Sequence, residues 1–288
     1  MKQPLKILSL GAGVQSTTLL LMSCRGVLPK LDAAIFADVQ WEPPAVYEHL
    51  SWLEHEAAKA GISVHRVTNG NLRKQTVEVF TRRGIGRGTS KRKRYTSMPF
   101  YVLNPSGTQG MIRRQCTSEY KIVPIERFIR QTLLNLKSKQ KAPANCVEQW
   151  FGISVDEQQR TRISMEKWKT NVYPLLNHPH DMLTQRYTRR QCLEWLHQNY
   201  PGRNVPRSAC IGCPFHNDEE WRHIKNDPAL WADAIEVDEA IRQTEGMDGQ
   251  VFLHRSCLPL KEVDLRTPRE KGQMDFGFEE ECFGYCGN

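Results

Sequence analysis

The sequence of 288 residues has no apolar run that approaches the length of a membrane span, which argues against an integral membrane protein. It also opens without a secretory signal, because Met1-Lys2-Gln3-Pro4 leads directly into the first apolar segment. Without such a signal, nine cysteines favour metal or redox chemistry over a disulfide scaffold. We therefore expect a cytoplasmic protein that has no membrane partner.

Two common phosphate-binding patterns are missing from the glycine-rich turn at residues 11–16. The turn has neither the lysine of the P-loop pattern nor the GxGxxG spacing. Acidic residues are in the minority, since 32 Asp and Glu stand against 40 Lys and Arg, for a net charge of +8. This excess of positive charge predicts a polyanion or a multiply phosphorylated nucleotide as partner.

Short apolar runs alternate with helical patterns in the first part of the chain. Strands are expected at 7–10, 33–38 and 62–67, with helical segments between them. This β-α-β-α-β order implies a parallel sheet with right-handed crossovers. We predict an α/β fold, a Rossmann-like parallel sheet with helices on both faces. A smaller, mainly helical C-terminal part carrying a CxxC motif is expected to follow.

The turn after the first strand has the composition of an anion site. Gly11 and Gly13 allow a phosphate to approach the backbone, and the helix that follows presents N–H groups at its positive end. Ser16 and Thr17 lie in the first helical turn, where a hydroxyl can cap the helix or contact a phosphate oxygen. The alternative is a tight strand-to-helix turn without a ligand.

Residues 11–16, Gly-Ala-Gly-Val-Gln-Ser, resemble the Ser-Gly-Gly-x-Asp-Ser loop of the N-type ATP pyrophosphatases. That superfamily includes phosphoadenylyl-sulfate reductases and tRNA thiolation enzymes. Gln15 stands in place of the family's Asp, and Gly11 in place of its first Ser. The resemblance implies a fold of the adenine nucleotide alpha-hydrolase type that binds ATP with Mg²⁺.

The resemblance also extends to residues beyond the turn. Asp38 ends the second strand, where it would bind a ribose or Mg²⁺, with helix capping as the alternative. Arg160 follows a strand at 148–154, and the corresponding arginine of the family faces nucleotide phosphate. The predicted nucleotide-binding residues are Ser9, Gly11, Ala12, Gly13, Gln15, Ser16, Thr17, Asp38 and Arg160.

Residues 81–94 form a basic segment without apolar periodicity, which is typical of a loop. Its seven cations are Arg82, Arg83, Arg87, Lys91, Arg92, Lys93 and Arg94. Aromatic residues follow directly, and cations interleaved with stacking groups suit single-stranded nucleic acid. We predict that these cations bind tRNA or another polyanion. A solvated charged loop and a nucleotide with an extra phosphate are the alternatives.

Three cysteines are predicted to bind a metal. Cys116 precedes a helical stripe, and Cys210 and Cys213 form a CxxC followed by proline, a tight turn that presents two thiolates to one metal. A redox dithiol is the alternative. Their order resembles that of the iron–sulfur ligands of cluster-containing adenylyl-sulfate reductases, which implies a [4Fe-4S] cluster. An arrangement of three cysteine ligands that leaves one iron open resembles the cluster site of the tRNA thiolation enzymes.

The C-terminus contributes two candidate catalytic thiols, Cys282 and Cys286. The terminal residues resemble the reductases' Glu-Cys-Gly-x-His, whose cysteine is catalytic, and a frayed tail is the alternative. Cys257, Cys282 or Cys286 would complete the cluster if it has a fourth cysteine.

The combined prediction is a nucleotide-binding α/β domain at 1–180 and a helical, cysteine-bearing region at 181–288. The favoured function is ATP-dependent sulfur transfer, in which a nucleic-acid base is adenylated and then thiolated with sulfur from a separate donor. The alternatives are a phosphoadenosine phosphosulfate reductase and a zinc-stapled RNA-binding protein. The substrate base, the sulfur donor and the presence of a homodimer stay open.

Overall fold

The computed structural model describes residues 3–78, 97–243, 247–267 and 270–271. Its centre is a five-stranded sheet in the order β3-β2-β1-β6-β7, in which every neighbouring pair is parallel. The strands are β1 (Leu5–Leu10), β2 (Ala33–Asp38), β3 (Ser63–Thr68), β6 (Val147–Phe151) and β7 (Lys169–Val172). The predicted parallel α/β fold is confirmed.

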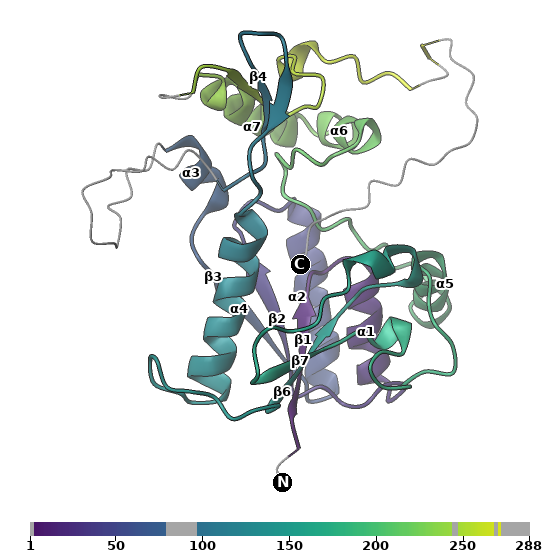
Figure 1. Cartoon of the computed structure of the whole chain (residues 1–288). Coiled ribbons are helices and arrows are strands. Elements are labelled where there is room, and N and C mark those ends of the chain that lie inside the picture. Colours follow the sequence, from purple (N-terminus) through teal and green to yellow (C-terminus); the bar gives the residue numbers. More distant parts are fainter. Residues whose placement is uncertain (1–2, 79–96, 244–246, 268–269, 272–288) are drawn as a thin grey trace.

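Helices cover both faces of this sheet (Figure 1). On one face α1 (Val14–Cys24) packs against α2 (Pro44–Lys59) and α5 (Arg189–Asn199). The other face holds α4 (Val123–Phe128), extended at both ends by π-helical turns at Thr117–Ile122 and Ile129–Leu133. Because β2 is buried on both sides, its sequence is a continuous apolar run: Ala34 and Phe36 face α1, and Ala33, Ile35 and Ala37 face α4.

The strand order places a topological switch beside β1. β2 lies on one side of β1, and β6 lies on the other. After β1 the chain therefore continues to β2 and toward one edge of the sheet, whereas after β6 it continues to β7 at the opposite edge. In open α/β sheets a ligand binds in the crevice at such a point.

A second layer lies above the carboxyl ends of the parallel strands (Figure 1). It contains an antiparallel sheet in the order β5-β4-β8. Its elements are α3 (Leu72–Val77), β4 (Tyr101–Leu103), β5 (Gln109–Met111), α6 (Asp218–Lys225), α7 (Pro228–Ile241) and β8 (Gln250–Phe252). One hydrophobic cluster joins Phe100 with Trp221 and Val237. Residues from both halves of the chain therefore build this layer, and the proposed boundary at residue 180 stays a prediction.

Single 3-10 turns complete the described fold at Val155–Arg160, Pro174–Leu176 and Leu260–Glu262. Within the described residues, none of the helices has the length and apolar character that crossing a membrane requires.

Candidate functional site

A cavity of about 600 Å³ opens at the topological switch, within the usual size range of small-molecule sites. Its walls come from the turn between β1 and α1, the segment after β6 and the chain around the CxxC motif. Six of the predicted nucleotide-binding residues line it: Ser9, Gly11, Gly13, Gln15, Ser16 and Arg160.

Residues of the turn that begins α1 line this cavity. Gly13 precedes the helix in an extended conformation, and no side chain caps the helix. Ser16 instead serves the turn itself, because its Oγ accepts from the Gly11 N–H at 3.2 Å and donates to the Gly13 carbonyl at 3.3 Å. An uncapped helix N-terminus carries a partial positive charge that attracts anions.

Ala12, between the two glycines, adopts the left-handed conformation with φ 58°. Its side chain is buried and does not line the cavity. The unusual backbone angle therefore falls on the residue between the two glycines and not on the glycines themselves.

Gly152 lets the end of β6 approach the start of α1. A Cβ atom at this position would lie 2.7 Å from the Ser16 nitrogen and 3.0 Å from the Gln15 carbonyl carbon. Both neighbours are backbone atoms that cannot rotate away, so only glycine fits. The sequence analysis included Gly152 in a strand but did not recognise this role, for which a glycine directly after a buried strand was the available signal.

Gln15 belongs to a polar group with Glu157 and Arg160. Its Nε2 lies 3.4 Å from both Glu157 Oε2 and Ser154 Oγ. The other carboxylate oxygen of Glu157 accepts from Arg160 at 2.8 Å. Glu157 is thus held by two donors, and Arg160 stands at the cavity wall with its charge partly balanced.

Two other predicted nucleotide-binding residues lie outside the cavity lining. Asp38 accepts from the Gln40 N–H at 2.7 Å and from the Tyr47 hydroxyl at 2.9 Å, which is a structural use of the carboxylate. Thr17 is fully buried with its hydroxyl 3.0 Å from His49 Nε2. Neither position offers a polar atom to the cavity.

The fold gathers the three predicted metal ligands around one small pocket of about 20 Å³ that Cys116, Cys210 and Cys213 all line. The CxxC turn is closed by a hydrogen bond from the Cys213 N–H to the Cys210 carbonyl at 3.0 Å. Three thiols around one pocket match the donor set of a cluster or of zinc. No group of three metal-capable side chains with metal geometry occurs among the residues that the structure describes, so the ligand roles stay predictions.

Cys213 lies between the two cavities, because it lines the cavity of about 600 Å³ as well as the cysteine pocket. Lys121 and Phe215 are shared in the same way. The Lys121 ammonium lies 3.6 Å from a carboxylate oxygen of the buried Glu42. The sequence analysis missed Lys121, which places a positive charge at the wall between the two cavities.

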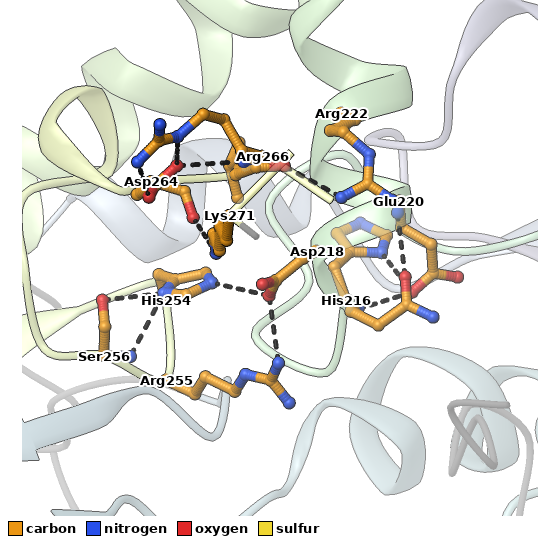
Figure 2. A network of polar contacts seen from close by, with 12 residues as sticks. His216, Asp218, Glu220, Arg222, His254, Arg255, Ser256, Asp264, Arg266 and Lys271 are labelled. Atoms are coloured by element: carbon orange, nitrogen blue, oxygen red, sulfur yellow. Dashed lines mark hydrogen bonds and ion pairs between the residues drawn. The ribbon is translucent and has the colours of Figure 1, made fainter. Parts of the chain in front are cut away.

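A polar network behind the CxxC turn supports it from α6 (Figure 2). His216 Nε2 lies 2.9 Å from the Cys210 carbonyl, and burial lowers the pKa of this histidine to about 4. Glu220 forms a capping box with Asn217 and pairs with Arg207. The remaining contacts of the network join α6 to the loop after β8.

Asp218, in the first turn of α6, makes two of those contacts, and Arg222 makes another by donating to the Leu265 carbonyl at 2.8 Å. The Asp218 carboxylate lies 3.3 Å from His254 Nε2 and accepts from Arg255 at 3.1 Å, as Figure 2 shows. The capping box and these two contacts fix the start of α6 and, through it, the cysteine turn that precedes it.

The remaining predicted site residues lie outside the described residues. They are the two candidate catalytic thiols, Cys282 and Cys286, and all seven cations of the basic segment at 82–94.

Comparison with protein-family models finds no match. Comparison with curated proteins finds none either. Among solved structures, the crystal structure of phosphoadenylyl-sulfate (PAPS) reductase from Candida auris, a phosphate complex, is similar over 71% of this chain and 75% of that one, with 12% sequence identity and a TM-score of 0.38.

Proposed function

We propose that this chain is a nucleotide-dependent sulfur-transfer enzyme that binds the phosphates of an adenine nucleotide at the start of α1. The observation that carries the proposal is the cavity shared by the glycine turn and Cys213. An anion site and a thiol that face one cavity are what a reaction between a nucleotide-borne group and sulfur requires. The cavity also carries Arg160, Arg189 and Arg207, which complement the charge of a phosphorylated ligand.

Within this class, two of the four carboxylate side chains that line the cavity favour reduction of a sulfonucleotide such as phosphoadenosine phosphosulfate. Glu157 is held by Gln15 and Arg160, and Asp156 accepts from the Arg189 N–H at 2.5 Å. Mg²⁺ bound to ATP takes one or two carboxylate ligands from the protein. Because these two carboxylates already bind protein donors, they favour a nucleotide whose reaction does not need them as Mg²⁺ ligands.

In such a reduction a thiolate attacks the sulfur atom of the sulfate. A sulfur–sulfur bond forms, the bond from that sulfur to the bridging oxygen breaks, and the electron pair leaves with the nucleotide phosphate. A second thiolate, from the chain or from an added dithiol, then attacks the sulfur of that cysteine, so that sulfite leaves with the electron pair of the first sulfur–sulfur bond and a disulfide forms. Cys282 and Cys286 are the candidates for this thiolate from the sequence. In the part of the chain that the structure describes, Cys213 is the thiol that lines the cavity.

The basic segment favours a second candidate, ATP-dependent thiolation of a nucleic-acid base. Seven cations at 82–94 and a net charge of +8 suit a polyanionic substrate. In this reaction adenylation turns the oxygen of the base into a good leaving group. The proposed [4Fe-4S] cluster, held by Cys116, Cys210 and Cys213, would supply an iron site for the incoming sulfide.

Isothermal calorimetry followed by product analysis tests the proposal. Phosphoadenosine phosphate and ATP are titrated into the protein with and without Mg²⁺, and the protein is then assayed for sulfite release from the sulfonucleotide. We expect the phosphoadenosine ligand to bind without Mg²⁺ and sulfite to form. ATP binding that requires Mg²⁺, with pyrophosphate release on RNA, would favour thiolation instead. If the protein bound neither nucleotide, a zinc-stapled RNA-binding protein would be the remaining candidate function.

A further inference from the structure

Trp41, in the loop after β2, packs against the CxxC turn and is hydrogen-bonded to it. The residue is buried, and its carbonyl oxygen accepts from the Ile211 N–H at 2.9 Å. Ile211 lies between the two cysteines of the motif. One backbone hydrogen bond therefore ties the centre of the cysteine turn to the carboxyl end of the parallel sheet.

The indole of Trp41 also fills the space beside Gly212. A Cβ atom on Gly212 would lie 2.3 Å from Cη2 and 2.7 Å from Cζ2 of the indole. Real atoms do not approach so closely, so the motif carries glycine here because the indole occupies the place of a side chain.

The indole is itself held from the opposite side. Its Nε1 donates to Asp233 Oδ2 on α7 at 2.6 Å. The other oxygen of Asp233 pairs with Arg73 on α3, and Arg73 also reaches Glu236 at 2.7 Å. Two helices thus fix the orientation of the ring that supports the cysteine turn.

The chain before the motif passes close to the glycine turn. A Cβ atom on Gly13 would lie 3.8 Å from Cβ of Ser208, two residues before Cys210. The segment from Ser208 to Cys213 is therefore confined between the anion site on one side and Trp41 on the other.

We infer that Trp41 is a positioning residue that sets the place of the Cys213 thiol at the wall of the nucleotide cavity. It acts on the thiol through Gly212 and Ile211. The importance of this position for sulfur transfer rests on the proposed function, whereas the packing itself does not depend on it.

Alkylation of the full-length protein by iodoacetamide tests the inference, with a chelator present and the rate at each cysteine followed by mass spectrometry. Gly212→Ala forces the turn away from the indole, and we expect Cys213 to react about tenfold faster. Cys192, a fully buried residue of α5, reports general opening of the fold and should keep its rate. Gly110→Ala is the matched control, because no atom lies within 4 Å of the added methyl group.

The double variant Gly212→Ala/Trp41→Phe separates positioning from simple packing. Phenylalanine lacks the outer ring atoms that meet the new methyl group, so the Cys213 rate should return toward the wild-type value. Trp41→Phe alone removes the indole donor and the support, and we expect it to raise the Cys213 rate severalfold. This variant only removes atoms, so it keeps the test available if Gly212→Ala does not fold.

Two results would overturn the inference. One is a Cys213 rate that stays unchanged in both single variants or rises together with that of Cys192. The other is a double variant that reacts faster than either single variant. Calorimetry with phosphoadenosine phosphate, run on the same proteins, keeps the two ideas apart. If the wild type binds no nucleotide, the proposed function fails, but the alkylation rates still decide the role of Trp41.

Discussion

The side-chain amide of Gln15 lies 3.4 Å from the carboxylate of Glu157, at the point where the start of α1 meets the segment after β6. A carboxylate in place of this amide would face Glu157 as a like charge. Gln15 is therefore matched to its neighbour, and the pair links the glycine turn to Arg160, which holds the other oxygen of Glu157.

Gln15→Asp tests this relationship. Two carboxylates at this distance repel each other, and together they form a pair of oxygen ligands for Mg²⁺. We expect the variant to bind phosphoadenosine phosphate about tenfold more weakly without Mg²⁺, and to recover affinity when Mg²⁺ is added. Calorimetry measures both constants. Gln15→Asn keeps the amide and is the control, and an Asp variant indifferent to Mg²⁺ would contradict the expectation.

Gly13→Val and Ser16→Ala separate blocking of the anion site from loss of one hydroxyl. Valine places methyl groups where a phosphate must approach, in space already bounded by Ser208. It should abolish nucleotide binding. Ser16→Ala removes the hydroxyl that accepts from the Gly11 N–H and donates to the Gly13 carbonyl. A neutral hydrogen bond contributes ~0.5–1.5 kcal/mol, so this variant should weaken binding severalfold, less than Gly13→Val does. If calorimetry gave equal affinities for Gly13→Val and the wild type, the nucleotide would not bind at this turn.

The three cysteines around the small pocket are expected to bind iron together. Replacing Cys116, Cys210 or Cys213 by alanine should abolish iron binding, because each supplies one of three protein ligands. Anaerobic purification with iron and sulfide analysis and an absorption spectrum measures this. Cys192→Ala is the matched control, since this buried thiol lies in α5, away from the pocket. Full iron occupancy in Cys210→Ala, or stoichiometric zinc in the wild type, would rule the cluster out.

The cations at 82–94 are expected to bind a polyanion larger than a mononucleotide. If about four of them contact phosphates, the log–log salt dependence of binding to single-stranded nucleic acid should have a slope of roughly −3. Neutralising Lys91, Arg92, Lys93 and Arg94 together should flatten that slope and leave ATP affinity nearly unchanged.

A reductase that uses these cations for an extra phosphate would behave in the opposite way. The fourfold variant would then lose affinity for phosphoadenosine phosphate, and the wild type would show no salt-dependent RNA binding. Fluorescence titrations of both ligands over a range of salt distinguish the two outcomes.

His49 should make the fold sensitive to acid. Burial, and to a smaller extent the charge of Arg203, lowers the pKa of His49 from 6.5 to about 4. Between those values the unfolded chain binds a proton that the folded chain does not, so stability falls as the pH falls from 6.5 to 4. Urea unfolding of His49→Gln should show a shallower decline over that range. Burial also lowers the pKa of His216, and this histidine is present in both proteins, so the difference between them reports His49. Equal slopes would contradict the assignment.

The sequence by itself determined the parallel sheet. Ala33 to Ala37 form an unbroken apolar run because β2 is covered by helices on both faces, and burial of that kind is recorded in local composition. The residues of the glycine turn that line the cavity were equally local, since Gly11, Gly13 and Ser16 lie within six consecutive residues of one turn.

Only the tertiary structure decided which distant residues share a site. Cys116 and Cys213 meet at one pocket because the second layer closes over the sheet, and Trp41 fills the space beside Gly212 for the same reason. Asp38 ends a strand at the expected edge, but its carboxylate accepts hydrogen bonds from Tyr47 and Gln40, and the residue does not line the cavity. Periodicity reports which face of an element is buried, whereas contacts between side chains far apart in the sequence depend on how the layers pack, which no local pattern contains.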